Sequence, residues 1–146
     1  MVLKSSGRVL RYALLIKQQS VASPYNSRMP IPSEIRGQRY ISLATFRKNG
    51  VAVHTPIWFA EDNGALCFMT NSKTGKCKRI HNNPRVTIAP CTIRGKITGP
   101  EFFATVRLLP PEDFARVRRA INQKYWLARL PFLWRNTDTY VQITPE

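Results

Sequence analysis

The sequence predicts a mainly β domain in which six short strands and two helices form a small closed or partly closed barrel. Three observations favour this class. From residue 39 onward, apolar and polar side chains alternate, and β-branched and aromatic residues are frequent. Asn-Gly dipeptides interrupt the pattern twice, as in tight hairpin turns. Two further interruptions have the spacing and start signals of helices.

The expected strands are, in chain order, 39–48, 51–61, 65–71, 85–95, 100–110 and 139–145. The first three form a meander, because Asn49-Gly50 and Asn63-Gly64 separate them. Both dipeptides suit two-residue hairpin loops, whose central residues need positive φ. Length and composition are those of one globular domain with its own core.

The first helix is expected over residues 73–82, after the capping pair Asn71 and Ser72. Cys77 and Ile80 form its buried face. The second helix follows in "PPEDFARVRRAINQKYW". It has a proline at its start, two acids in its first turn, and an apolar stripe of Phe114, Val117 and Ile121.

The charge of the chain is unusual, with 23 basic residues against 8 acidic ones and a net charge of +15. Such an excess favours a polyanion, a phosphorylated ligand or an anionic membrane surface as partner. No apolar run approaches the ~20 residues that a membrane span needs.

The three cysteines, Cys67, Cys77 and Cys91, form neither a CxxC motif nor a cluster with histidines. We therefore expect no metal site and no disulfide framework. A reducing, cytoplasmic location is the expectation that follows.

Residues 1–29 form a basic extension to a domain that spans residues 30–146. The extension contains five basic residues, several serines and no acid. It is interpreted as a disordered tail or as the result of a start codon placed too early, since Met29 resembles a natural beginning. A cleaved organelle presequence has the same composition and remains an alternative.

The segment "NSKTGKCKRIHNNPRV", residues 71–86, contains no carboxylate and five cations: Lys73, Lys76, Lys78, Arg79 and Arg85. Positive charge is unfavourable at a helix N-terminus, because the helix dipole is already positive there. The free N–H groups of the first turn, the Ser72 hydroxyl and the nearby lysines would suit a phosphate. The alternative is a solvated helix face.

The segment "VHTPIWF" contains a proline inside an expected strand. Pro56 cannot donate to a ladder, so the strand must bulge there or lie at a sheet edge. Exposed backbone groups beside Thr55 and Trp58 would be able to bind a planar heterocycle. The alternative is that Trp58 belongs to the core and Pro56 only marks an edge.

Side chains suited to proton transfer are few. His54 and His81 lie on different expected elements, and no Ser-His-Asp set or pair of carboxylates is visible. No catalytic residue is therefore assigned. If the protein is an enzyme, its chemistry is expected to reside in a bound cofactor.

The run from "RYISLATFRKNG" to "PEFFATVRLL" resembles the pyridoxamine 5'-phosphate oxidase-like (PPOX) flavin and deazaflavin oxidoreductases. It is most similar to their F420-dependent subgroup. The most specific pieces are "SLATFRKNG", "TPIWF", "TGKCKRIHNNPRVTIAPC" and "RGKITGP". The apolar stretch 127–137 departs from the family pattern and is interpreted as a lid, a dimer contact or a membrane-touching patch.

The resemblance implies a six-stranded split β-barrel (an FMN-binding split barrel) with two or three short helices. It also implies a homodimer with cofactor sites at the interface. The cofactor would be F420, or alternatively FMN, and the reaction a hydride transfer to a small unsaturated or quinone-like substrate. Tyr125 and Tyr140 are candidates for lining the site. Carried onto this chain, the residues that border the ring are Thr55, Pro56, Ile57 and Trp58, and those that hold the phosphate are Thr70, Ser72, Lys76, Lys78 and Arg79.

Two other functions stay open at this point. A non-enzymatic protein on the same barrel would bind flavin, haem or another tetrapyrrole. A nucleic-acid-binding barrel is less favoured, because the cations cluster at one strand–helix junction without interleaved aromatic residues.

Overall fold

The structure is a computed structural model that describes residues 29–130 and 135–146. The basic extension expected over residues 1–29 lies outside this range except for Met29, and so does part of the apolar stretch 127–137. The elements are β1 (Tyr40–Phe46), β2 (Ala52–Trp58), β3 (Ala60–Asp62), β4 (Ala65–Thr70), α2 (Gly75–Asn82), β5 (Arg85–Pro90), β6 (Phe102–Leu108), η1 (Pro111–Asp113), α3 (Phe114–Lys124), η2 (Trp126–Arg129) and β7 (Thr139–Pro145).

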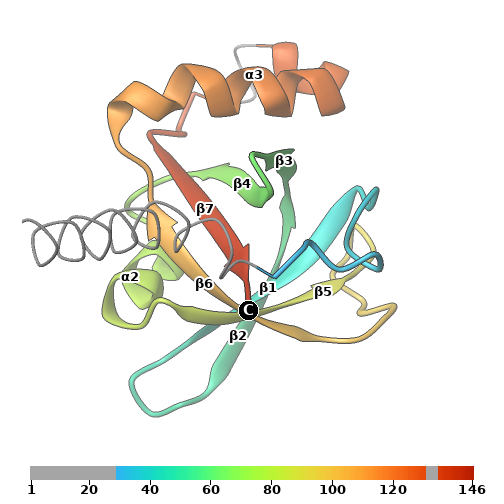
Figure 1. Cartoon of the computed structure of the whole chain (residues 1–146). Helices are drawn as coiled ribbons and strands as arrows, with labels where there is room; N and C mark the ends of the chain where they lie inside the picture. Colours follow the sequence, from blue (N-terminus) through green and yellow to red (C-terminus); the bar gives the residue numbers. More distant parts are fainter. Residues whose placement is uncertain (1–28, 131–134) are drawn as a thin grey trace, which may run out of the picture.

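The described strands form one antiparallel sheet in the order β2-β1-β5-β6-β7-β4-β3. Its two edge strands, β2 and β3, follow one another directly in the chain. The sheet therefore has to curl until its two edges meet where β2 ends and β3 begins. Figure 1 shows this curled sheet, with α3 lying across one end. The mainly β fold of a split barrel is confirmed.

The strand expected over residues 51–61 is divided at Phe59, which raises the number of described strands to seven. The division has a physical cause. The N–H and C=O of Phe59 contact the hydroxyl of Tyr125 at 3.1 and 2.8 Å instead of a neighbouring strand. The chain can therefore leave β1 at this residue and pair with β4.

The two Asn-Gly turns differ in form. At Asn63-Gly64 both residues have positive φ (51° and 75°), as a two-residue hairpin loop requires. At the first turn only Gly50 does, with φ 85°. The Gly50 N–H donates to the Arg47 carbonyl at 2.9 Å, so this turn is one residue longer than expected.

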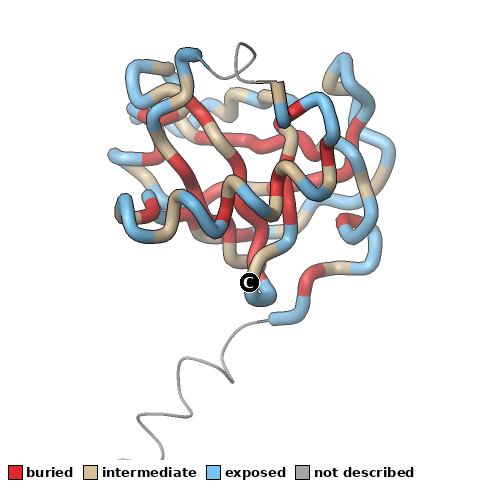
Figure 2. The backbone as a smooth tube through the Cα atoms, turned by 90° about the horizontal axis from the view of Figure 1, so that it is seen from above, coloured by how far each residue is buried: buried red, intermediate tan, exposed pale blue. Residues whose placement is uncertain are grey.

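Strand alternation divides the core into two layers. The inner layer fills the barrel and contains residues from every strand except β3, such as Leu43, Phe68 and Ile143. The outer layer packs Val117 and Ile121 of α3 against the other face of the sheet. Figure 2 shows buried residues along the strands and exposed ones along the loops. The apolar stripe predicted for the second helix is confirmed, with Phe114 partly buried beside it.

The strand expected over residues 85–95 ends earlier, at Pro90. Beyond it, the chain forms a loop closed by an isolated bridge between Cys91 and Ile97. Gly95 has φ 88° in this loop, a conformation that L side chains rarely adopt.

No helix among the described residues has the length and apolar character to cross a membrane. The three cysteines are free and buried. In the same part of the chain, no group of three or more His, Cys, Asp or Glu side chains is arranged to hold a metal ion.

Candidate functional site

The basic helix α2 begins later than the sequence suggested. Its N-cap is Thr74, whose hydroxyl oxygen accepts the N–H of Cys77 at 3.4 Å. Asn71 caps only the preceding turn, where its side-chain oxygen accepts the N–H of Lys73 at 2.8 Å. The expected capping pair Asn71 and Ser72 is therefore corrected to Thr74. The first turn of α2 contains no acid, so the cations there have no carboxylate on their own helix.

Ser72 binds an anion that belongs to the protein itself. Its N–H and its hydroxyl both donate to the carboxylate of Asp138, each at 2.7 Å. These hydrogen bonds, with a further one from Thr139, lower the pKa of Asp138. A phosphate at Ser72 would have to compete with this carboxylate.

Two of the predicted phosphate residues, Lys76 and Arg79, point toward the barrel. The Lys76 ammonium lies 5.5 Å from the centre of the Phe68 ring, and burial lowers the pKa of Lys76. The Arg79 Nε donates to the hydroxyl of Thr45 on β1 at 2.7 Å. Gly75 makes room for this arrangement, since a Cβ there would lie 2.8 Å from the Arg79 guanidinium.

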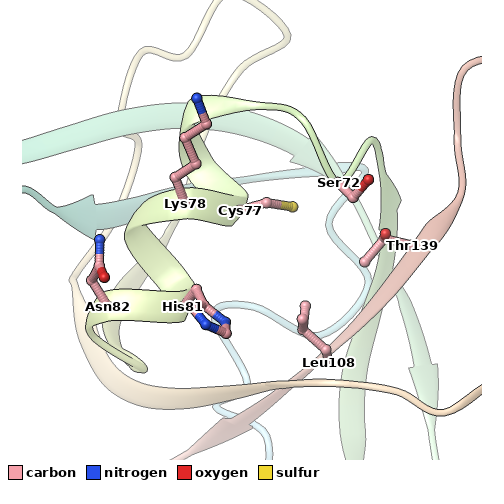
Figure 3. Close-up of a pocket in the computed structure, with 7 residues that line it drawn as sticks. All are labelled: Ser72, Cys77, Lys78, His81, Asn82, Leu108 and Thr139. Carbon is pink, nitrogen blue, oxygen red and sulfur yellow. The ribbon is translucent and has the colours of Figure 1, made fainter.

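The other predicted phosphate residues are separated from this pair. Ser72 and Lys78 line a cavity of about 390 Å³ between α2, the end of β6 and the start of β7. In Figure 3 the Cys77 thiol points into this cavity, while the Lys78 ammonium points away from its centre. Thr70 is buried at the end of β4. Residues adjacent in the sequence therefore lie on two sides of α2.

The four predicted ring-side residues are divided by strand alternation. Ile57 is buried inside the barrel, and Thr55 lies two positions away on the same face. Pro56 and Trp58 lie on the outer face. Pro56 is close to the loop after β5, where a Cβ on Gly95 would lie 3.6 Å from its ring.

β2 is an edge of the sheet, which is one of the alternatives that Pro56 left open. The Arg47 N–H donates to the Val51 carbonyl, so these two residues are a hydrogen-bonded pair. In an antiparallel ladder such pairs alternate with non-hydrogen-bonded pairs, whose backbone groups point away from the partner strand. The N–H and C=O of His54 and the C=O of Pro56 then point away from β1. The missing N–H of Pro56 falls at a position where no ladder bond is lost.

Tyr125 ties together three segments that are far apart in the sequence. Its hydroxyl accepts the N–H of Phe59 and lies 2.7 Å from the carbonyl of Arg39 and 2.8 Å from that of Phe59. Its ring stacks on Trp58, with centroids 4.8 Å apart and an interplanar angle of 13°. Burial raises the pKa of Tyr125 to about 12, so it is a poor proton donor.

Tyr140, the other tyrosine expected to line the site, packs against Phe114 with ring centroids 4.5 Å apart. Both tyrosines belong to the outer core layer. The sequence does not predict the bridging role of Tyr125. Its one sequence signal is an aromatic residue directly after an amphipathic helix, and that signal does not specify its partners.

Lys124 is the second basic residue with an unusual environment. Its ammonium lies 3.5 Å from the centre of the Phe59 ring and donates to the Gln38 carbonyl at 2.6 Å. Burial lowers the pKa of Lys124 to about 8, and the Glu61 carboxylate opposes the shift. This ammonium joins the end of α3 to the segment before β1.

The lowered pKa predicts a pH-dependent stability. Between pH 8 and 10.5 the unfolded chain keeps a proton on Lys124 that the folded chain releases. The contribution of Lys124 to the free energy of unfolding should therefore increase as the pH is raised from about 8 to 10.5. The same contribution is lost when the pH is lowered again through this window. Urea unfolding at several pH values measures the free energy of unfolding of the wild type and of Lys124→Met. The value for the wild type minus that for the variant should increase with pH. A difference independent of pH would contradict the assignment.

Comparisons with known proteins identify similar folds. A family model described as pyridoxamine 5'-phosphate oxidase matches residues 31–142. No curated protein matches. Three solved structures illustrate the likeness, which at these identities concerns the fold.

The haem storage protein HutZ from Vibrio cholerae is 15% identical, with a TM-score of 0.58, over 81% of this chain and 92% of its own. An F420 reductase is 21% identical, with a TM-score of 0.56, over 80% of this chain and 96% of its own. A protein of unknown function from Agrobacterium tumefaciens is 15% identical, with a TM-score of 0.59, over 73% of this chain. This chain spans about half (47%) of that protein.

Proposed function

This chain belongs to the pyridoxamine 5'-phosphate oxidase family, and on that premise we propose that it is an oxidoreductase with a deazaflavin or flavin cofactor. F420 is favoured over FMN, because the sequence resembles the F420-dependent subgroup and a structural relative is an F420 reductase. The substrate is a small unsaturated or quinone-like compound.

One observation carries this proposal. Lys76 and Arg79 lie together on the barrel side of α2, and neither forms an ion pair with any carboxylate among the described residues. Lys76 is half-buried, and burial without a counter-charge is unfavourable for an ammonium group. A bound phosphate would supply the missing negative charge.

The residues of β2 fit the ring of such a cofactor. The backbone groups of His54 and Pro56 that point away from β1 would bind polar atoms at the edge of a planar heterocycle. The cofactor supplies the hydride chemistry when bound. Lys76 and Arg79 hold its phosphate, and β2 orients its ring.

We further propose that the protein is a homodimer whose interface includes the β2 edge. The loop beside Pro56 exposes two large apolar side chains, Ile93 at 66% and Ile97 at 39%. Apolar surface of this kind is unfavourable in water and suits a second copy. Interface residues from that copy would complete the wall over the ring.

A second candidate function is supported by the small number of side chains suited to proton transfer among the described residues. The buried Tyr125, with its raised pKa, is poorly suited to acid catalysis, and no catalytic pair is assigned. A non-enzymatic binder of flavin, haem or another tetrapyrrole is therefore the alternative, and HutZ, a haem storage protein, has a similar fold. A nucleic-acid-binding barrel is less favoured.

Absorption and fluorescence spectra after equilibrium dialysis with F420 or FMN test the proposal. Retention of F420 over FMN, followed by oxidation of reduced F420 in the presence of quinones, is the expected result. Retention of FMN would assign FMN as the cofactor in place of F420. A haem-like Soret band would support the non-enzymatic alternative. Binding of none of these compounds would overturn the proposal and direct attention to salt-dependent nucleic-acid binding.

A further inference from the structure

A small aromatic cavity lies on the outer face of β1 and β2, away from α2. Its volume is about 60 Å³. A cavity that holds one water molecule has a probe-occupied volume of about 10–15 Å³, so this cavity is large enough for the edge of a single aromatic ring. It is lined by Arg39, Tyr40, Trp58, Tyr125, Trp126 and Leu127.

The floor of the aromatic cavity is held rigidly. Trp58 stacks on Tyr125, and Tyr40 lies at a tilt of 53° to Trp58, with centroids 6.5 Å apart. Tyr125 is in turn fixed by its hydrogen bonds to Phe59 and Arg39. A ligand ring would therefore meet aromatic surfaces that are already positioned, which reduces the entropy lost on binding.

The rim of the cavity exposes apolar surface. Trp126 is 67% exposed, the highest value among the large apolar side chains of the described residues, and Leu127 is 42% exposed. An indole in this position can contact one face of a ring whose edge enters the cavity. Aromatic rings prefer such offset or tilted contacts.

Arg39 adds a positive charge to the aromatic cavity. Its side chain is exposed and forms no ion pair with any carboxylate of the described residues. Its backbone carbonyl is fixed by the Tyr125 hydroxyl, so the position of the residue is defined. A guanidinium beside aromatic faces recognises a carboxylate or sulfonate on a flat ring.

We propose that the aromatic cavity binds a planar aromatic or quinone-like compound that carries an anionic group. The aromatic floor and the exposed indole at the rim favour an aromatic ring over an aliphatic anion. The unpaired guanidinium of Arg39 favours an anionic ring over a neutral one. That the compound is also the substrate of the enzyme rests on the proposed function above. Binding itself does not, because the cavity is formed by this chain without a cofactor.

Calorimetric titration of the cofactor-free full chain with benzoate tests the proposal. Two matched probes accompany it: benzamide, which has the ring without the charge, and cyclohexanecarboxylate, which has the charge without the aromatic ring. We expect benzoate to bind about tenfold more tightly than either probe, the change in affinity that one charge-assisted contact or one stacked ring typically produces. No saturable benzoate binding, or equal affinity for all three probes, would overturn the proposal.

Variants locate the binding. Arg39→Gln should lower benzoate affinity to that of benzamide and leave benzamide unchanged. Trp126→Ala should weaken both ligands, and Trp126→Phe should restore most of the affinity. The controls Arg94→Gln and Phe103→Ala remove an exposed cation and a similarly exposed aromatic side chain elsewhere, and should have no effect. If Arg39→Gln and Arg94→Gln behave alike, the aromatic cavity is not the site.

The benzoate titration and the cofactor-retention experiment can fail independently of each other. Benzoate binding without retention of F420 or FMN would overturn the oxidoreductase and leave the aromatic cavity as a binding site. Retention of a cofactor without benzoate binding would overturn the aromatic site alone.

Discussion

Replacing Lys76 and Arg79 together with alanine is expected to weaken cofactor binding by roughly 3–6 kcal/mol, since each charge-assisted contact contributes about 1.5–3 kcal/mol. Both cations face the barrel, and among the described residues neither is neutralised by a carboxylate. Calorimetric titration with F420 and with FMN measures the loss. Unchanged affinity for both cofactors would show that the phosphate lies elsewhere.

Two control variants determine which side of α2 holds the phosphate. Lys78→Ala removes a cation whose ammonium points away from the centre of the cavity between α2 and β7. Asp138→Asn removes the carboxylate that accepts both donors of Ser72. With the phosphate at Lys76 and Arg79, both controls should bind the cofactor nearly as well as the wild type. Tighter binding by Asp138→Asn would instead assign the phosphate to Ser72.

Replacing Tyr125 with phenylalanine is expected to destabilise the fold by roughly 2–4 kcal/mol, because a buried polar group left without a partner costs about 1–3 kcal/mol. The variant would leave the N–H and C=O of Phe59 without the Tyr125 hydroxyl at the point where β2 ends and β3 begins. Phenylalanine keeps the ring that stacks on Trp58, so packing changes little. Chemical denaturation gives the free energy of unfolding.

The matched control for this prediction is Tyr140→Phe. Tyr140 lies in the same outer core layer and is almost equally buried, at 6% exposure against 7% for Tyr125. Its hydroxyl makes no hydrogen bond with the described residues. A loss for Tyr125→Phe no greater than that for Tyr140→Phe would mean that the hydroxyl does not hold the three segments together.

The strands were predictable because their signals are local. A period of two residues places Leu66 and Phe68 inside the barrel and Cys67 on its outer face, and the sequence displays this alternation directly. The same holds for Val117 and Ile121 on α3, where the period is that of a helix. Local patterns also limited Pro56 to a bulge, a sheet edge or exposed backbone, and the edge is what the structure shows.

What the sequence did not predict depends on contacts between distant residues. Ser72 and Asp138 are 66 positions apart, so no window around Ser72 indicates that its donors already bind a carboxylate. The division of the second strand at Phe59 depends on Tyr125, also 66 positions away. The N-cap of α2 is a different case, because Thr74 and Asn71 are both residue types that cap helices. Only the backbone geometry of the structure shows that Thr74 is the N-cap.

The position of β7 in the sheet has a consequence for synthesis of the protein. β7 pairs with β4 on one side and with β6 on the other, so it is an interior strand that is translated after the other six described strands of the sheet. Until residues 139–145 have left the ribosome, β4 and β6 both present open edges, which are templates for pairing with other chains. The nascent chain must therefore pass through a stage in which the edges of β4 and β6 are open in addition to those of β2 and β3. Chaperone dependence or aggregation during expression should be determined by how quickly β7 is inserted.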